Sequence, residues 1–200
     1  MEAIEKYHLN TDPLVSLKAW YQDAKTCEQN PEAMTLATID QALMRPMTRT
    51  VLLKGFKDGN LCFYTNYESV KAHNLNKIDE GSILFYWHVS KRQVRVQGRV
   101  EKMSEADSAK YFHSRDRQSQ IASYISKQST PIASKEELLD RMREVEKEFE
   151  GKEIPLPKYW GGYIFKPYEF EFFLYGEYRI NDRFLYRKEN SNWIITRLQP

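Results

Sequence analysis

The chain has 200 residues, 41% of them apolar, which is enough to bury one substantial core. Its 30 basic and 28 acidic side chains leave a formal net charge of +2, and this balance argues against a nucleic-acid-binding protein that relies on bulk electrostatic attraction. The first ten residues lack the apolar centre of a signal peptide, and no apolar run is long enough to cross a bilayer. We therefore expect one domain over residues 1–200, a cytoplasmic location, and neither a membrane nor a nucleic acid as partner.

The first predicted element is an amphipathic helix. Asp12 is a favourable N-cap, Pro13 suits the first helical position, and apolar residues then recur at helical spacing as far as Ala24. Residues 34–40 alternate enough to form a strand. Pro46 follows, and because proline cannot donate a ladder hydrogen bond, we expect it at the start of the next strand or on a sheet edge.

A hairpin is predicted next, followed by a second helix. Residues 48–56 and 61–66 are rich in β-branched and apolar side chains, and Asp58-Gly59 between them is a turn signal that supplies positive φ angles. The two strands are therefore expected to pair antiparallel. Ser69 is the candidate N-cap of the helix that follows.

The start of this second helix is a candidate anion site. Its first turn has free backbone N–H groups and a partial positive charge. Lys71 lies in that turn, and Thr65 and Ser69 offer hydroxyl groups nearby. Arg49, on the preceding strand, could bring a guanidinium to the same place, and the combination suits a phosphate. The alternative is a capped helix beside a solvated surface.

Two further strands are predicted in the middle of the chain. Residues 82–89 are almost wholly apolar, as expected of a strand covered on both sides. Residues 93–103 alternate, so that one face belongs to the core. The other face is either solvated or lines a ligand or subunit contact; its members are Gln93, Arg95, Gln97, Arg99 and Glu101.

Polar helices follow these strands. Ser104 begins a capping-box pattern that opens a helix. Tyr111, Arg115 and Ser119 are spaced four residues apart, so on a continuous helix they share a face and one anion could meet all three. The alternative is a surface face of salt bridges. Ser134 opens another charged amphipathic helix, to which we assign no chemistry.

The C-terminal part adds strands and completes the predicted fold class. Four strands are expected after Pro157, over residues 160–165, 170–175, 183–188 and 193–198. With no internal repeat, the pattern predicts a mainly β, barrel-like antiparallel fold with flanking helices.

Several kinds of site are not supported. The four histidines, His8, His73, His88 and His113, are scattered without zinc-ligand spacing, so no metal is expected. Nucleophile-elbow, Walker and dinucleotide motifs do not occur in the sequence. Two cysteines, Cys27 and Cys62, are too few for a disulfide framework and are predicted to be buried thiols in a reducing compartment.

Eight short motifs in one order carry a family resemblance that spans nearly the whole chain. They are RTVLLK (49–54), FYTN (63–66), RQVRVQG (92–98), YFHSR (111–115), SQI (119–121), SKQS (126–129), WGGY (160–163) and DRFLY (182–186). On these residues the chain resembles the pyridoxamine/pyridoxine 5′-phosphate oxidases. The resemblance implies an FMN-binding split β-barrel homodimer with two FMN molecules at the subunit interface, which oxidises either phosphate ester to pyridoxal 5′-phosphate with O2 as acceptor and releases H2O2.

The resemblance also implies roles for individual residues. FMN contacts fall on Arg49, Thr50, Val51, Leu52, Leu53, Lys54, Tyr64, Thr65, Lys71, Gln93, Gln128, Ser129, Phe173 and Arg183. Substrate contacts fall on Lys54, Tyr111, Arg115, Ser119, Arg179 and Asn181, with Arg179 near the carbon that is oxidised. Arg49 and Lys54 have opposite parity on an ideal strand, so contacts from both require a twist or bulge, or two ligands on different sides.

The sequence departs from the family pattern at four places. Val70 and Phe173 stand where the family has an arginine and a tryptophan, and Asn181 replaces a histidine. The N-terminal segment is expected to be too short to carry the arginine and tyrosine that close over substrate. These departures keep a second hypothesis open, a flavin or pyridoxal phosphate binding protein with little oxidase activity. A third, an FMN-dependent reductase, would need a nicotinamide site that the sequence does not identify.

Overall fold

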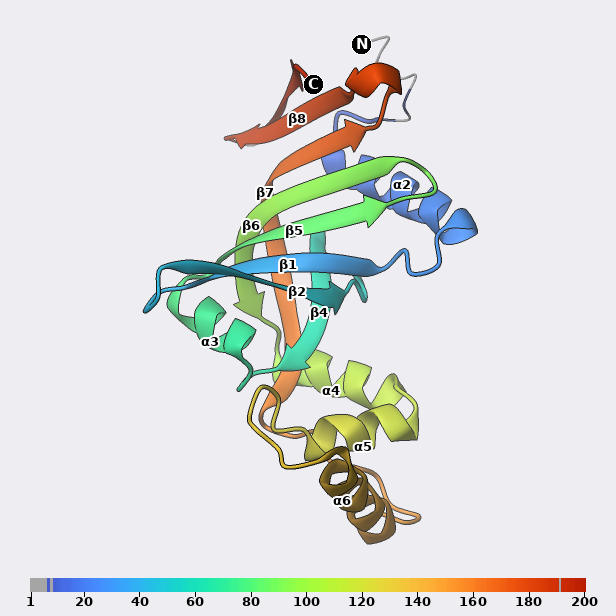
Figure 1. The fold of residues 1–200 in the computed structure, drawn as a ribbon, viewed down its shortest axis with the longest axis vertical. Helices are drawn as coiled ribbons and strands as arrows, with labels where there is room; N and C mark the ends of the chain where they lie inside the picture. Colours follow the sequence, from blue (N-terminus) through green and yellow to red (C-terminus); the bar gives the residue numbers. More distant parts are fainter. Residues whose placement is uncertain (1–6, 8, 191) are drawn as a thin grey trace.

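The computed structural model describes residues 7, 9–190 and 192–200, and within them an antiparallel sheet of nine strands dominates. The strands are β1 (Ala33–Asp40), β2 (Arg45–Leu52), β3 (Gly55–Lys57), β4 (Asn60–Asn66), β5 (Glu80–Trp87), β6 (Arg92–Lys102), β7 (Trp160–Leu174), β8 (Asp182–Glu189) and β9 (Asn192–Leu198). They are hydrogen-bonded in the order β2-β1-β5-β6-β7-β4-β3, while β8 pairs with β7 and β9 with β8. The long strand β7 therefore connects the two ends of the molecule (Figure 1).

The helices occupy distinct places along this sheet. They are α2 (Pro13–Cys27), α3 (Val70–Lys77), α4 (Glu105–Ser114), α5 (Arg117–Ile125), α6 (Lys135–Glu148) and a short 3₁₀ helix, η1 (Glu177–Arg179). Figure 1 shows α4, α5 and α6 gathered at one end of β7, with β8, β9 and η1 at the other. Within the described part of the chain, no helix combines the length and apolarity that a membrane crossing needs.

The main core lies on one face of the sheet. The alternation predicted for β6 is confirmed, because Val94 and Val96 are fully buried there. Phe172 on β7 is buried beside them, and the Trp20 ring of α2 meets it edge-on at 5.0 Å. Asp12 caps α2 as predicted, since its side chain accepts a hydrogen bond from the Leu14 N–H. A second buried cluster lies under the α4–α6 helices and consists of Phe112, Ile121, Ile154 and Trp160.

The predicted hairpin is only partly confirmed. The turn at Asp58-Gly59 exists, and both residues have positive φ angles. However, the strand that carries Arg49 is β2, which pairs with β1 along its whole length, and only the short β3 pairs with β4. The chain leaves the β2 ladder after Leu52 and turns through Gly55, whose φ of +143° favours glycine. Strict alternation therefore does not extend from Arg49 to Lys54, and their opposite parity no longer places them on opposite sides.

The continuous helix on which Tyr111, Arg115 and Ser119 would share one face does not form. Helix α4 ends at Ser114, and Arg115 is extended, with φ −80° and ψ 157°. The Asp116 side chain then accepts from the Ser119 N–H and starts α5 as a separate helix. The Asp116 N-cap, which lies between Tyr111 and Ser119, thus divides the four-residue pattern between two helices. Ser104 and Ser134 do cap helices as predicted.

Three smaller predictions also need correction. Strand β5 is not covered on both sides, because the Tyr86 side chain on its outer face is 53% exposed. The two strands predicted over 160–175 are one strand, β7, which continues through Pro167 and absorbs an extra residue, Tyr168, where its register with β6 shifts. Cys62 is buried as predicted, but Cys27 is exposed.

Candidate functional site

Ten of the residues singled out from the sequence line one cavity of about 250 Å³ at the helical end of the sheet. Strand β2, the segment after it, strand β4 and helices α3 and α4 all contribute side chains. The cavity is lined by Thr50, Val51, Leu52, Lys54, Tyr64, Thr65, Lys71, Tyr111, Arg115, Gln128 and Trp160. Residues from five helices and strands and from the segments that connect them therefore meet at one place, as the anion-site hypothesis requires.

Lys71 is the most unusual group in this cavity. Only 9% of the residue is exposed, and its ammonium donates to Thr65 Oγ1 at 3.0 Å, Ser69 Oγ at 3.1 Å and Gln128 Oε1 at 2.7 Å. All three acceptors are neutral. Burial, assisted by the nearby charge of Arg49, lowers the pKa of Lys71 to about 8. Within the described residues no carboxylate forms an ion pair with this ammonium, so an anionic ligand would supply the missing charge.

Arg49 does not line the cavity, but its charge is close enough to Lys71 to lower the pKa of that ammonium. Its Nη1 donates to the Leu36 carbonyl oxygen at 3.2 Å, to Thr38 Oγ1 at 2.7 Å and to the Met47 carbonyl oxygen at 2.9 Å. Burial lowers the pKa of Arg49. Its partners are again neutral, so its positive charge adds to that of Lys71 without being cancelled locally.

Three aromatic residues, Tyr64, Tyr111 and Trp160, form an aromatic wall in the lining of the cavity. The rings of Tyr64 and Tyr111 stack with centroids 3.8 Å apart, and Trp160 stacks on Tyr64 at 5.5 Å. The Arg115 guanidinium lies 4.9 Å from the Trp160 ring centroid and donates to Ser123 Oγ at 2.8 Å. Burial lowers the pKa of Arg115 and raises that of Tyr64 to about 12. A planar ligand with an anionic group suits such a wall.

Trp160 and Ser123 are residues that the sequence reasoning did not assign to the site. Trp160 was noted only as part of the WGGY motif, and Ser123 had no signal because its role depends on where Arg115 points. Conversely, nine predicted contacts do not line the cavity, and four of these are Arg49, Leu53, Ser119 and Ser129. Leu53 is buried in the main core, and Ser119 lies in the first turn of α5.

The remaining predicted residues form a second group at the other end of β7. Gln93, Phe173 and Arg183 are direct neighbours across β6, β7 and β8, on the sheet face opposite the core. Arg183 packs 5.8 Å from the Phe173 ring centroid. Arg179 and Asn181 lie in the connection between β7 and β8, where Asn181 Oδ1 accepts from the Gly176 N–H.

The connection that carries Arg179 has an uncommon backbone. Tyr178 and Arg179 both have positive φ angles, 54° and 63°, which residues other than glycine rarely adopt. Strain of this kind concentrates at functional sites. Arg179 is exposed, so its guanidinium is available to a ligand that approaches this end of the sheet.

The two groups of residues are too far apart to serve one ligand within one chain. Trp160, at the start of β7, belongs to the cavity, and Phe173, thirteen residues further along the same strand, belongs to the second group. At ~3.3 Å per residue this is roughly 40 Å of strand, far longer than a flavin nucleotide. Either the second group has another role, or it completes the cavity of a neighbouring copy.

The nine-stranded antiparallel sheet and its flanking helices define a split β-barrel protein, which confirms the predicted fold class, and the cationic, aromatic-lined cavity is its candidate anion site. A family model described as pyridoxamine 5′-phosphate oxidase matches residues 22–148. A second model, described as the pyridoxine 5′-phosphate oxidase C-terminal dimerisation region, matches residues 160–200. The chain belongs to the pyridoxamine 5′-phosphate oxidase family, and the resemblance seen in its motifs is confirmed.

Individual relatives agree with this assignment. The chain is 44% identical over 199 residues to a pyridoxine/pyridoxamine 5′-phosphate oxidase of Shewanella sediminis, covering 98% of this chain and 93% of that one. It is 42% identical to the protein of the same name from Deinococcus deserti, with the same coverage. Among solved structures, PhzG of Burkholderia lata, in complex with tetrahydrophenazine-1-carboxylic acid, superimposes with a TM-score of 0.89 at 26% identity, covering 96% of this chain and 94% of that one. A pyridoxamine 5′-phosphate oxidase-related, FMN-binding protein of Nostoc punctiforme shares the fold, with a TM-score of 0.78 at 15% identity over 96% of this chain and all of that one.

Proposed function

We propose that this protein is an FMN-dependent oxidase that converts pyridoxamine 5′-phosphate or pyridoxine 5′-phosphate to pyridoxal 5′-phosphate, with O2 as acceptor and H2O2 as product. Family membership supports the reaction class. The observation that carries the proposal is the buried Lys71 ammonium, which has only neutral partners and faces a cavity with an aromatic wall. A buried cation without a counter-ion is costly unless a ligand provides one.

The residues around Lys71 fit the phosphate of FMN. Lys71, Thr65 and Gln128 already share hydrogen bonds, so an incoming phosphate would find one cation and two polar side chains in place. Arg49 adds positive charge, and the β2 residues Thr50–Leu52 line the same cavity. When bound, FMN supplies a hydride acceptor that dioxygen reoxidises with release of hydrogen peroxide.

The substrate phosphate would be held by the remaining cavity cations. Lys54 and Arg115 line the cavity with Tyr111, and in the described part of the chain neither cation is paired with a carboxylate. Ser119, in the first turn of α5 just after Arg115, stays a proposed contact to the same phosphate. These groups recognise a dianion and offer little to an uncharged alcohol, so they would select phosphate esters.

We infer a homodimer from the separation of the two groups of residues. Gln93, Phe173 and Arg183, proposed FMN contacts, lie at the end of β7 remote from the cavity, as do Arg179 and Asn181. One flavin can meet both groups only if two chains contribute, and two such sites would then hold two FMN molecules. The match of residues 160–200 to a dimerisation region supports this inference. We also propose that residues 1–200 form one domain, because β7 runs through both groups of residues.

Arg179 is the proposed catalytic residue. It would place a guanidinium beside the carbon that is oxidised, with Asn181 as a neighbouring substrate contact. The N-terminal segment is expected to be too short to carry the arginine and tyrosine that close over substrate. Of residues 1–8 the structure describes only Tyr7, whose hydroxyl donates to Asp182 Oδ2 at 2.6 Å. The prediction about the rest of that segment lies outside the described residues.

Hydrogen peroxide production tests the proposal. We expect turnover with pyridoxine 5′-phosphate and pyridoxamine 5′-phosphate and none with the unphosphorylated forms, because Lys54, Tyr111 and Arg115 address a dianion. Arg115→Ala should raise KM strongly, whereas Arg179→Ala should lower kcat more than it raises KM. Absence of peroxide with both esters, together with binding of pyridoxal 5′-phosphate, would replace the oxidase by a binding protein. Flavin reduction by a nicotinamide cofactor would instead favour a reductase.

A further inference from the structure

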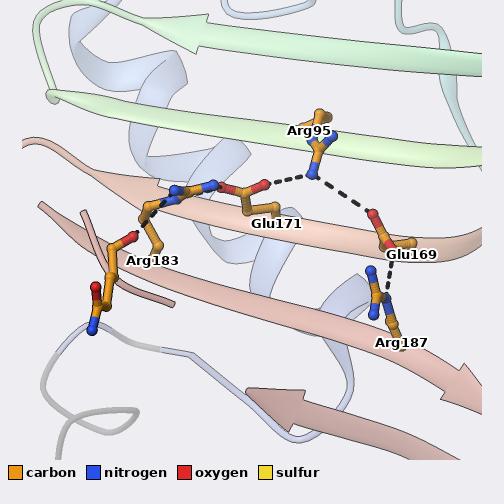
Figure 2. A network of polar contacts seen from close by, with 6 residues as sticks. Arg95, Glu169, Glu171, Arg183 and Arg187 are labelled. Atoms are coloured by element: carbon orange, nitrogen blue, oxygen red, sulfur yellow. Dashed lines mark hydrogen bonds and ion pairs between the residues drawn. The ribbon is translucent and has the colours of Figure 1, made fainter. Parts of the chain in front are cut away.

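An ionic network covers the outer face of the sheet next to the second group of residues. It joins Arg95 on β6, Glu169 and Glu171 on β7, and Arg183 and Arg187 on β8, as Figure 2 shows. Glu171 is at its centre: its side chain is only 5% exposed and lies between two arginines. A buried carboxylate is stable only when it is paired in this way.

The two oxygens of Glu171 have separate partners. Oε1 accepts from Arg183 Nε at 2.8 Å and lies 2.7 Å from Arg183 Nη2, so it holds one side of that guanidinium. Oε2 accepts from Arg95 Nη2 at 2.6 Å. Arg95 thus pairs with the carboxylate oxygen that Arg183 does not contact. Glu171 lies on β7, between β6, which carries Arg95, and β8, which carries Arg183.

The Arg183 guanidinium is left with a defined free edge. Besides Glu171, its only described acceptor is the Gln199 carbonyl oxygen, which receives a hydrogen bond from Nη1 at 3.1 Å. A guanidinium has five N–H groups, so one hydrogen on Nη1 and one on Nη2 remain available. The guanidinium also lies over the Phe173 ring, which limits its rotation.

We propose that Glu171 is a positioning residue for FMN binding: its buried carboxylate fixes the Arg183 guanidinium so that the two free N–H groups point to the flavin. The inference rests on the proposed function, because Arg183 is there an FMN contact. A long arginine side chain that is already ordered loses less conformational freedom when it binds, so its orientation raises affinity without a contact between Glu171 and the ligand.

The test is the dissociation constant of FMN, measured by titrating the FMN-free protein and following flavin fluorescence. Glu171→Gln keeps the shape of the side chain but turns a donor toward Arg95 or Arg183, and we expect it to raise the dissociation constant about tenfold. The matched control is Glu169→Gln, on the same strand and face. Glu169 pairs with Arg187 and more loosely with Arg95, not with Arg183, so an effect below about twofold is expected.

A double-mutant cycle separates positioning from general stability. In an Arg183→Ala background, Glu171→Gln should change the dissociation constant by less than about twofold, because the group through which it acts is gone. A loss of affinity that is the same in both backgrounds would overturn the inference, since it would show a structural effect unrelated to Arg183. An unchanged dissociation constant for Glu171→Gln in the native background would overturn it as well.

A second variant guards against misfolding. If Glu171→Gln does not fold, it can be combined with Arg95→Gln, which removes the Arg95 charge that Glu171 no longer balances. Arg183 still lacks its carboxylate partner in this double variant, so the tenfold loss of FMN affinity should persist. Recovery of native affinity in that combination would contradict the inference. Failure of the proposed function looks different: the unmodified protein would then bind no FMN at all.

Discussion

The cavity and the ionic network both contain several cationic side chains, but these have neutral partners in the cavity and carboxylate partners in the network. At the helical end, Lys71, Arg49 and Arg115 have neutral hydrogen-bond partners, and within residues 7, 9–190 and 192–200 no carboxylate pairs with them. At the other end of β7, two carboxylates, Glu169 and Glu171, hold all the arginines of the network. Because unpaired buried charge is costly, the cavity is suited to receive an anion, whereas the network orients arginines in advance.

Mixing two defective variants is the strongest test of whether these regions act together. Arg115→Ala damages the cavity and Arg179→Ala the remote end, so each variant alone should give little peroxide at low substrate concentration. After subunit exchange, the mixture should recover about a quarter of the native rate, because half of the randomly paired dimers are mixed and each contains one intact site. Each variant exchanged with itself is the control. No recovery would mean that one chain builds a whole site.

Removal of the Lys71 charge should have the next largest effect. Lys71→Met is expected to weaken FMN binding by roughly 1.5 to 3 kcal/mol, the contribution of a hydrogen bond to a charged group. The FMN-free variant should at the same time unfold at a higher temperature, because a buried ammonium without a counter-ion no longer has to be desolvated. Lys77→Met, an exposed lysine on the same helix α3, should change neither quantity noticeably. Equal effects of the two variants would remove the distinction between cavity and surface charge.

The pH dependence of FMN affinity gives a smaller, directional effect. The pKa of Lys71 is lowered to about 8 in the ligand-free protein, so the ammonium is present below pH 8 and lost above it. A bound phosphate favours the charged form and raises this pKa, so binding above pH 8 takes up a proton. Affinity should therefore be level from pH 7 to 8 and fall by up to about tenfold per unit above that. Titrations of Lys71→Met over the same range should be flat; a slope that persists would assign the effect to another group.

The smallest change is expected at Asn181, at the remote end. Asn181→His replaces an amide by an imidazole, which can still donate and accept hydrogen bonds and becomes cationic below about pH 6.5. We expect kcat with pyridoxine 5′-phosphate to be retained or moderately improved, with the larger gain at acidic pH. A pH–rate profile of both proteins is the measurement. A severe loss of kcat would show that the Asn181 hydrogen bond to the Gly176 N–H is needed to shape the Arg179 connection.

Much of the fold follows from local patterns. The Asp12 cap, the Asp58-Gly59 turn and the alternation along β6 each depend on residues close together in the chain, and each is confirmed. Predictions that needed a distant partner were less accurate. Periodicity cannot show that β2 pairs with β1 in place of β4, because both choices satisfy the same alternation. Likewise, the four-residue spacing from Tyr111 to Ser119 hid the Asp116 cap that separates α4 from α5.

The sequence by itself determined which residue types are available to the site, and its motifs are sufficient to indicate the family. Only the tertiary structure decided how they are grouped. Lys71 and Gln128 are 57 residues apart and bond directly, whereas Arg183 is remote from both and bound to Glu171. The physical reason is that a side chain's environment depends on strand partners, burial and neighbouring charge, and these are properties of the folded chain. The lowered pKa of Lys71 arises in the same way, because it comes from burial.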